Sequence, residues 1–302
     1  MPAPNSRSWK TRTEAGSAFS IDVAAWVTRV LGRTAVAIFL VPVVAYFLLV
    51  RVEERRASRN FLSRVLRRNP HWWEIFGHFH TFARVASDRL FILTGRMDKL
   101  KVVIHGRPLL QSIAEKGSGC IILSSHLGSF EATRAASFDR PDIALHVLID
   151  RSLNPNFQRR LESFDPVLAS RVIDASRPPT ALAMELAGVL GKAGWIGVPA
   201  DRFRPGDKTL NCRFIGDQAL FPAGPFNMAC AFDVPIVFSV GLLLDGQYHL
   251  YFESLERSAA RGREQRQQCA QLLAEAFADR LEIYTRIAPY NWFNFFDFWP
   301  GQ

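Results

Sequence analysis

Two titratable side chains, His126 and Glu131, stand where a short apolar stretch gives way to polar residues. Residues 120–123 read Cys-Ile-Ile-Leu, which is typical of a strand covered on both faces, and the alanines after Glu131 favour a helix. His126 is therefore predicted at the carboxyl end of a strand. At this spacing Glu131 can accept a hydrogen bond from one imidazole nitrogen and leave the other free as a general base. The nucleophile can then be a substrate hydroxyl.

The spacing His126-x4-Glu131 resembles the His-x4-Asp/Glu signature of the lysophospholipid acyltransferase superfamily, specifically its late lipid A (lauroyl and myristoyl) acyltransferase branch. Residues 147–151 (Val-Leu-Ile-Asp-Arg) resemble the superfamily's second block. Three later stretches resemble blocks of that branch in the same order: 197–202 (Gly-Val-Pro-Ala-Asp-Arg), 221–225 (Phe-Pro-Ala-Gly-Pro) and 234–237 (Val-Pro-Ile-Val). The resemblance covers about the last two-thirds of the chain. The block at 197–202 lacks the Pro-Glu-Gly of the glycerolipid enzymes, so the acceptor is not carried over from them.

The resemblance implies transfer of a fatty acyl group from a thioester to a hydroxyl of a lipid or glycolipid. His126 is expected to remove the hydroxyl proton, and Glu131 to fix the imidazole tautomer. The expected donor is an acyl carrier protein thioester, with coenzyme A as the second choice. No cofactor is expected besides this co-substrate. The implied location is the cytoplasmic face of the inner membrane.

The transfer also needs donors for the negative charge that develops on the carbonyl oxygen. The backbone N–H groups of Gly128 and Ser129, at the start of the expected helix, are the candidates.

Four charged residues further along the chain are candidates for substrate contacts. Arg151 is expected to contact a phosphate or carbonyl group, because guanidinium presents a fixed fork of donors, and Arg160 is a second candidate. Arg151 can instead form a surface ion pair. Asp201 and Arg202 follow an apolar stretch and either bind polar groups of the acceptor or cap the next loop.

Two other functions are compatible with the sequence. A serine hydrolase would use Ser124 or Ser125 with His126, although a nucleophile elbow reads Gly-x-Ser-x-Gly and is missing at this position. A non-enzymatic basic protein that binds membranes or nucleic acid is the other alternative. The basic residues cluster beside an apolar segment, which favours a membrane over nucleic acid.

The composition of the 302-residue chain suits an enzyme that works at a membrane. Apolar residues make up 48% and the net charge is +9, so an acidic partner is expected. The four cysteines are far apart and form no Cys-x2-Cys pair, which predicts reduced core cysteines. His78-Phe79-His80 lacks neighbouring carboxylate or thiol ligands, so no metal site is predicted there.

The N-terminal part predicts a membrane anchor. Residues 34–50 are uncharged and apolar, contain Pro42, and are followed by seven arginines between positions 51 and 68. This length is at the lower limit of a membrane span, so the segment is expected either to span the bilayer or to lie in its interface; a buried core helix is the alternative. The expected division is an anchor region at 1–60 and a catalytic domain at 61–302.

From residue 100 onward, short β-forming stretches alternate with helical patterns. Strands are predicted near 101–105, 120–125, 143–149, 171–174, 195–199, 235–244 and 247–253. This alternation predicts an α/β fold with a mixed or parallel sheet flanked by helices. Ligands bind beyond the carboxyl ends of such strands, where His126, Arg151 and Asp201 are all expected. The aromatic residues at 290–299 are expected to pack on the domain or to lie at the membrane interface.

Overall fold

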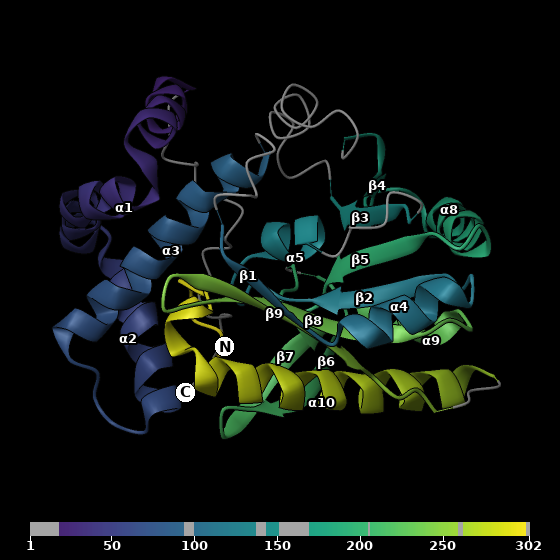
Figure 1. The fold of residues 1–302 in the computed structure, drawn as a ribbon. Helices are drawn as coiled ribbons and strands as arrows, with labels where there is room; N and C mark the ends of the chain where they lie inside the picture. Colours follow the sequence, from purple (N-terminus) through teal and green to yellow (C-terminus); the bar gives the residue numbers. More distant parts are fainter. Residues whose placement is uncertain are drawn as a thin grey trace.

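A seven-stranded sheet forms the centre of the protein in a computed structural model that describes residues 18–93, 100–136, 143–150, 169–204, 206–258 and 262–299 (Figure 1). The strand order is β1-β9-β8-β2-β5-β3-β4. The strands are β1 (Val102–His105), β2 (Cys120–Ser124), β3 (Leu145–Ile149), β4 (Val172–Asp174), β5 (Trp195–Pro199), β8 (Ile236–Leu244) and β9 (Gln247–Ser254). Strands β8, β2, β5, β3 and β4 are parallel, whereas β9 runs antiparallel to β8 and parallel to β1. The predicted α/β fold with a mixed sheet is confirmed.

Helices cover both faces of this sheet, and β2 shows why its sequence is apolar throughout. Ile121 and Leu123 pack in the cluster that contains the apolar side of α10, whereas Cys120 and Ile122 pack in the cluster that contains residues of α3 and α4. A strand buried on both faces has no polar alternation. Among the described residues, the helices that follow the N-terminal region are α4 (Arg107–Glu115), α5 (Phe130–Ala136), α8 (Pro179–Gly191), α9 (Ala223–Ala231), α10 (Arg263–Ile287) and the 3-10 helix η4 (Pro289–Asn291).

An antiparallel hairpin, β6 (Thr209–Phe214) and β7 (Asp217–Pro222), lies beside α10 and was not predicted from the sequence (Figure 1). Its turn residues Ile215 and Gly216 both have positive φ, 51° and 89°. Asparagine or aspartate usually precedes the glycine in such a turn, so Ile-Gly gives no hairpin signal. The fold holds Ile215 in place because its side chain is buried and its backbone N–H donates to Glu282 of α10.

In the part of the chain that the structure describes, three helices precede the sheet: α1 (Ala18–Val50), α2 (Val52–Leu66) and α3 (Trp72–Leu93). In the described part of the chain, no single helix is long and apolar enough to cross a membrane. Residues 35–50 and α2 meet the length and composition requirement only as a pair, bent by 98°. The break falls at Arg51 and not at Pro42, which lies inside α1. Helix α2 spans the boundary expected at residue 60, and its Phe61 and Leu62 belong to the main core cluster.

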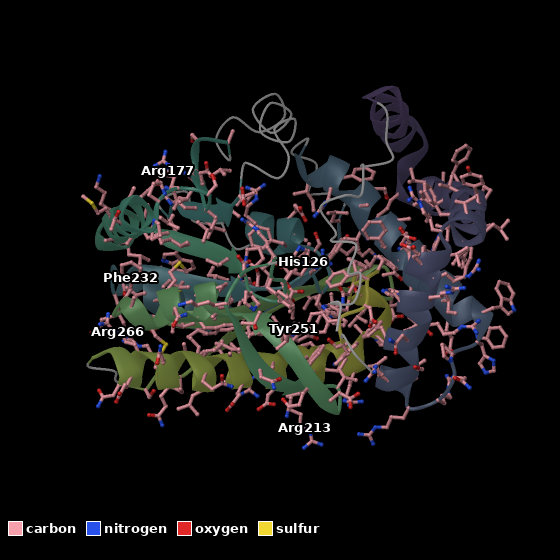
Figure 2. The ribbon with its side chains drawn as sticks, turned by 180° about the vertical axis from the view of Figure 1, so that it is seen from behind. His126, Arg177, Arg213, Phe232, Tyr251 and Arg266 are labelled. Atoms are coloured by element: carbon pink, nitrogen blue, oxygen red, sulfur yellow. A yellow bond between two sulfur atoms is a disulfide. The ribbon has the colours of Figure 1, made fainter. Side chains whose placement is uncertain are left out.

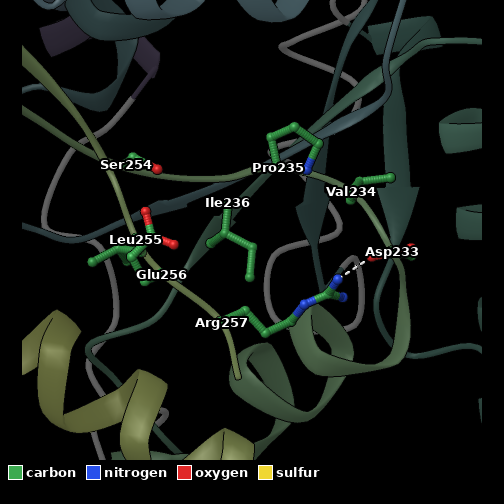
Figure 3. Close-up of a pocket in the computed structure, with 8 residues that line it drawn as sticks. All are labelled: Asp233, Val234, Pro235, Ile236, Ser254, Leu255, Glu256 and Arg257. Atoms are coloured by element: carbon green, nitrogen blue, oxygen red, sulfur yellow. Dashed lines mark hydrogen bonds and ion pairs between the residues drawn. The ribbon is translucent and has the colours of Figure 1, made fainter. Parts of the chain in front are cut away.

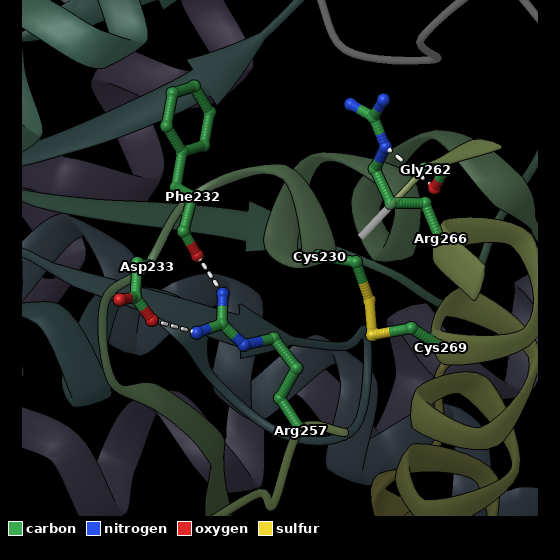
Figure 4. The surroundings of a disulfide bond; sticks show 7 residues. All are labelled: Cys230, Phe232, Asp233, Arg257, Gly262, Arg266 and Cys269. Atoms are coloured by element: carbon green, nitrogen blue, oxygen red, sulfur yellow. Dashed lines mark hydrogen bonds and ion pairs between the residues drawn. A yellow bond between two sulfur atoms is a disulfide. The ribbon is translucent and has the colours of Figure 1, made fainter. Parts of the chain in front are cut away.

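Two of the four cysteines form a disulfide, Cys230–Cys269, which joins α9 to α10 (Figure 4). The prediction of reduced cysteines is therefore wrong for this pair, whereas Cys120 and Cys212 are free and buried. Sequence spacing missed the bond because the two residues are 39 positions apart and meet only when α9 packs on α10.

Candidate functional site

His126 and Asp201 form a hydrogen-bonded dyad at the carboxyl edge of the parallel strands. The Nδ1 atom of His126 lies 2.8 Å from Oδ1 of Asp201, and the His126 backbone N–H donates to Oδ2 at 2.9 Å. Asp201 is fully buried, whereas the His126 side chain keeps 40% of its surface exposed. His126 lies near the middle of the molecule in Figure 2. The dyad therefore joins a buried carboxylate to an accessible imidazole.

The register of two neighbouring strands brings these residues together. Strands β2 and β5 are parallel, and Ser124 pairs with Pro199 at their ends. The Ala200 N–H continues this pairing by donating to the Ser124 carbonyl at 2.8 Å. His126 and Asp201 each follow their strand's last residue by two positions, so they arrive at the same level of the sheet edge.

The charge of Asp201 decides the tautomer of His126. Burial alone would raise the pKa of Asp201, but the charge and hydrogen bonds of His126 and the positive charge of Arg202 lower this pKa to about 2. An ionised carboxylate only accepts hydrogen bonds, so Nδ1 of His126 carries the proton and Nε2 keeps its lone pair. Among the described residues, none bonds to Nε2.

The imidazole of His126 favours its neutral form. Its pKa lies below the ordinary value because the ring is partly withdrawn from water and is repelled by the positive charges of Arg202 and Arg89, which together outweigh the attraction of Asp201. A neutral imidazole with a free Nε2 is the form that can accept a proton from a substrate.

Glu131 lies in the first turn of α5 and pairs with another element. Its Oε1 forms an ion pair with Nη2 of Arg89 of α3 at 2.7 Å, and its Oε2 accepts the Ser129 hydroxyl at 3.4 Å. The carboxylate that holds His126 is thus Asp201 and not Glu131, contrary to the sequence-based expectation. The reason is that α5 turns Glu131 toward α3, whereas Asp201 comes from the neighbouring strand.

The backbone donors expected at Gly128 and Ser129 already have partners. The Gly128 N–H donates to the Asn291 carbonyl and the Ser129 N–H to the Gly241 carbonyl, both at 2.8 Å. The expectation that they are free for an oxyanion is therefore wrong. Gly128 has a φ of 77°, and a Cβ there would lie 2.0 Å from the Gly241 oxygen, so only glycine fits this contact.

Arg202 lies beside the dyad. Its Nη2 donates to the Phe293 carbonyl at 2.7 Å, and its guanidinium lies over the ring of Phe296. Its Nε is buried and has no hydrogen-bond partner within the described residues. Arg151 and Arg160, the other two arginines predicted to bind substrate, lie outside the residues that the structure describes.

The two serines before His126 contribute little to the site. Both are buried, with 2% of Ser124 and 6% of Ser125 exposed. The Ser124 hydroxyl has no partner in the described part of the chain, and the Ser125 hydroxyl accepts the Leu127 N–H at 3.3 Å. Neither hydroxyl bonds to the imidazole of His126, which a serine nucleophile would require.

Sequence reasoning missed two residues that act on the dyad. The indole Nε1 of Trp292 donates to Oδ2 of Asp201 at 3.4 Å. Arg89 reaches Glu131 from α3 and lowers the pKa of His126 by its charge. No local pattern marks either residue, although the aromatic segment at 290–299 was predicted to pack, and Trp292, Phe298 and Trp299 are indeed buried.

The His78-Phe79-His80 motif bonds to backbone and hydroxyl groups. His78 Nε2 bonds to the Trp292 carbonyl at 2.9 Å and its Nδ1 to the Ser58 hydroxyl at 2.8 Å. His80 Nε2 bonds to the Ala37 carbonyl at 2.9 Å. No cluster of three or more metal-ligating side chains occurs in the described ranges.

A pocket of about 290 Å³ lies at the opposite end of the central strands and is lined by residues 233–236 and 254–257 (Figure 3). Arg257, its main cation, is bonded to Asp233 and to the Phe232 carbonyl. The pocket adjoins the first residues of β8, which pair with the start of β2, so it is remote from the dyad at the other end of these strands.

Comparison with models of known protein families finds no match to this chain, and a search of curated proteins finds none either.

Proposed function

We propose that this protein is an O-acyltransferase that moves a fatty acyl group from a thioester to a hydroxyl of a lipid or glycolipid. The observation that carries this proposal is the dyad itself. A buried, ionised Asp201 holds Nδ1–H of His126, and this leaves a neutral Nε2 at an accessible sheet edge. This arrangement suits a general base that acts on a substrate hydroxyl.

In the proposed reaction, the acceptor oxygen attacks the thioester carbonyl carbon while Nε2 of His126 takes the hydroxyl proton. The resulting imidazolium is stabilised by Asp201. When the tetrahedral intermediate collapses, the carbon–sulfur bond breaks and the leaving sulfur takes the proton from Nε2. The products are an ester and a thiol, and the histidine returns to its neutral state.

The negative charge of the intermediate needs a partner other than the Gly128 and Ser129 amides, which are already bonded. Arg202 is our candidate because its Nε is a buried donor without a partner in the described residues and its charge already acts on His126. A preorganised charged donor stabilises a developing oxyanion strongly. Arg89 is a second positive charge near the base.

The alternative of a serine hydrolase has less support, because neither Ser124 nor Ser125 bonds to His126. The alternative of a non-enzymatic membrane-binding protein gives no reason for a buried carboxylate to orient an exposed imidazole. Burying a charge costs free energy unless the charge is fully hydrogen-bonded, so such a dyad favours a catalytic role.

We propose that the enzyme works at the cytoplasmic face of the inner membrane, with the N-terminal helices in contact with lipid. Helix α1 exposes several large apolar side chains, including Phe39 at 61% and Leu49 at 74%, and Trp72 at the start of α3 is 69% exposed. An exposed apolar face of this kind suits contact with a lipid surface, where tryptophan is favoured.

We further propose an acyl carrier protein thioester as the donor. On α2 and directly after it, Arg56, Arg59 and Arg67 are exposed and make no ion pair within the described residues. Arg64 and Arg68, by contrast, pair with Asp217 and Glu74. An acidic carrier protein would be attracted to the unpaired arginines, and salt would weaken that attraction.

The test of activity uses the purified full-length protein with radiolabelled acyl carrier protein and coenzyme A thioesters of equal chain length, and a panel of lipid and glycolipid acceptors. His126→Ala is expected to lower transfer by about 10²–10⁴-fold. His249→Ala, whose ring contacts His105 on the edge strand, is the matched control and should keep wild-type activity. Wild-type transfer by His126→Ala would overturn the proposal.

The test of the donor reverses the charge of Arg56, Arg59 and Arg67 together. Because these residues form no ion pair in the described structure, the fold should persist. We expect a larger loss with the carrier-protein donor than with coenzyme A. Equal losses would instead assign the three arginines to membrane or acceptor binding.

A further inference from the structure

The segment 291–293, which follows α10, is paired along the loop that carries His126. Leu127 and Trp292 form an antiparallel bridge, and the Phe293 N–H donates to the His126 carbonyl at 3.2 Å. Asn291 anchors this segment to β8, since its side-chain amide bonds to both the N–H and the carbonyl of Leu243. The loop of the proposed base is thus held by backbone pairing to the end of the chain.

The indole of Trp292 reaches the buried partner of His126. Its Nε1 is 3.4 Å from Oδ2 of Asp201, the same oxygen that accepts the His126 backbone N–H. Trp292 is fully buried, and its ring lies at 5.0 Å from that of Phe61 and 5.1 Å from that of Phe214. Packing by these rings fixes the direction of the indole N–H.

The other end of Trp292 is held by a buried histidine. The Trp292 carbonyl only accepts hydrogen bonds, so Nε2 of His78 carries the proton and Nδ1 accepts the Ser58 hydroxyl. Burial lowers the pKa of His78 to about 4, and the ring therefore stays neutral near pH 7. Ser58 belongs to α2 and His78 to α3, so both helices contribute to the position of Trp292.

We propose that Trp292 is a positioning residue for the His126–Asp201 dyad, and that His78 holds Trp292 in place. The positioning of the dyad is a property of the folded chain and needs no substrate. Only the predicted effect on the reaction rate rests on the proposed function. The indole N–H is the third donor to the Asp201 carboxylate, after the ring and the backbone of His126.

Removal of this donor has a defined effect on the base. A carboxylate with fewer donors attracts the imidazole proton more strongly, so His126 should hold a proton up to a higher pH. The charged groups that act on His126 are Asp201 and Arg202 beyond β5 and Arg89 on α3, whose own partner is Glu131 on α5. None of these is changed by a substitution at Trp292.

The test compares Trp292→Phe with Trp299→Phe in the full-length protein. Both changes remove an indole N–H from the same aromatic cluster, where the two rings are 6.0 Å apart. The Nε1 of Trp299 has no partner among the described residues, so this variant controls for packing. The His126 imidazole is titrated by NMR, with its signal assigned by its loss in His126→Gln.

We expect the titration midpoint of the His126 imidazole to rise by about half a pH unit in Trp292→Phe, because the carboxylate loses one weak hydrogen bond. In Trp299→Phe the midpoint should stay unchanged. No shift in Trp292→Phe, or an equal shift in both variants, would overturn the proposal. Because the titration needs no substrate, it tests the role of Trp292 independently of acyl transfer.

Two substitutions test the role of His78. His78→Gln keeps an N–H donor for the Trp292 carbonyl and should titrate like the wild type, whereas His78→Leu should shift His126 as Trp292→Phe does. If His78→Leu does not fold, the comparison of the two tryptophan variants still decides the proposal. If acyl transfer is detected, Trp292→Phe should lower kcat about tenfold and leave KM unchanged. The reason is that the substitution changes the orientation of the His126 imidazole and not the contacts that bind the substrate.

Discussion

Nη2 of Arg89 on α3 lies 2.7 Å from Oε1 of Glu131 on α5. This ion pair engages the carboxylate that the sequence motif places closest to His126, and it leaves Asp201 as the residue that orients the imidazole. Two carboxylates near one histidine thus have separate partners. Their separate roles can be tested by substitution.

Asp201→Asn is expected to lower acyl transfer by about 10²–10⁴-fold, because a neutral amide neither stabilises the imidazolium nor fixes its tautomer. Glu131→Gln removes only the charge paired with Arg89 and is expected to cost less than about tenfold. Initial rates with the labelled thioester provide the measurement, and circular dichroism checks the fold of both variants. Equal losses for the two variants would contradict the assignment of separate roles.

The stability of the protein should fall between pH 7.5 and pH 5 because of His78. Its pKa is about 4 in the folded protein but near 6.5 when unfolded, so the unfolded chain binds this proton first as the pH falls. The free energy of unfolding is therefore highest near pH 7.5 and is lower by roughly 2 kcal/mol at pH 5.

Urea unfolding at the two pH values measures this effect, with His78→Gln as the comparison. Glutamine does not titrate and keeps a donor for the Trp292 carbonyl, so the part of the pH dependence due to His78 should disappear. An unchanged pH dependence in His78→Gln would show that other groups cause it.

The Cys230–Cys269 disulfide predicts how many thiols react in the denatured protein. Protein purified and denatured without reductant should show two reactive thiols, Cys120 and Cys212, and reduction should raise the number to four. Replacing Cys230 and Cys269 by serine should lower the free energy of unfolding by about 2–4 kcal/mol, since the bond closes a loop between positions 39 apart. Four reactive thiols before reduction would contradict the bond.

The exposed face of α1 predicts binding to lipid. The double change Phe39→Glu and Leu49→Glu should reduce flotation of the full-length protein with anionic vesicles several-fold, because charge opposes burial in the lipid interface. Met184→Glu on α8 is the matched control, since this residue is also apolar and 76% exposed. Equal flotation of the double variant and the wild type would rule out α1 as the contact surface.

The sequence by itself determined the elements and the edge of the sheet where the site lies. The seven predicted strands of the sheet exist because apolar runs such as 120–123 are buried on both faces, and this signal is local. The position of His126 just after a strand followed from the same pattern. In parallel strands, the carboxyl ends share one edge, so Asp201 was also expected there.

Only the tertiary structure decided which carboxylate meets His126. Glu131 is five residues away in sequence, but the turn at Gly128 and the direction of α5 carry it to Arg89. Asp201 is 75 residues away, and the pairing of Ser124 with Pro199 brings it to 2.8 Å. The Cys230–Cys269 bond and the contact of Trp292 with Asp201 likewise depend on packing between distant segments. Register and helix packing are set by the whole core, and no local spacing encodes them.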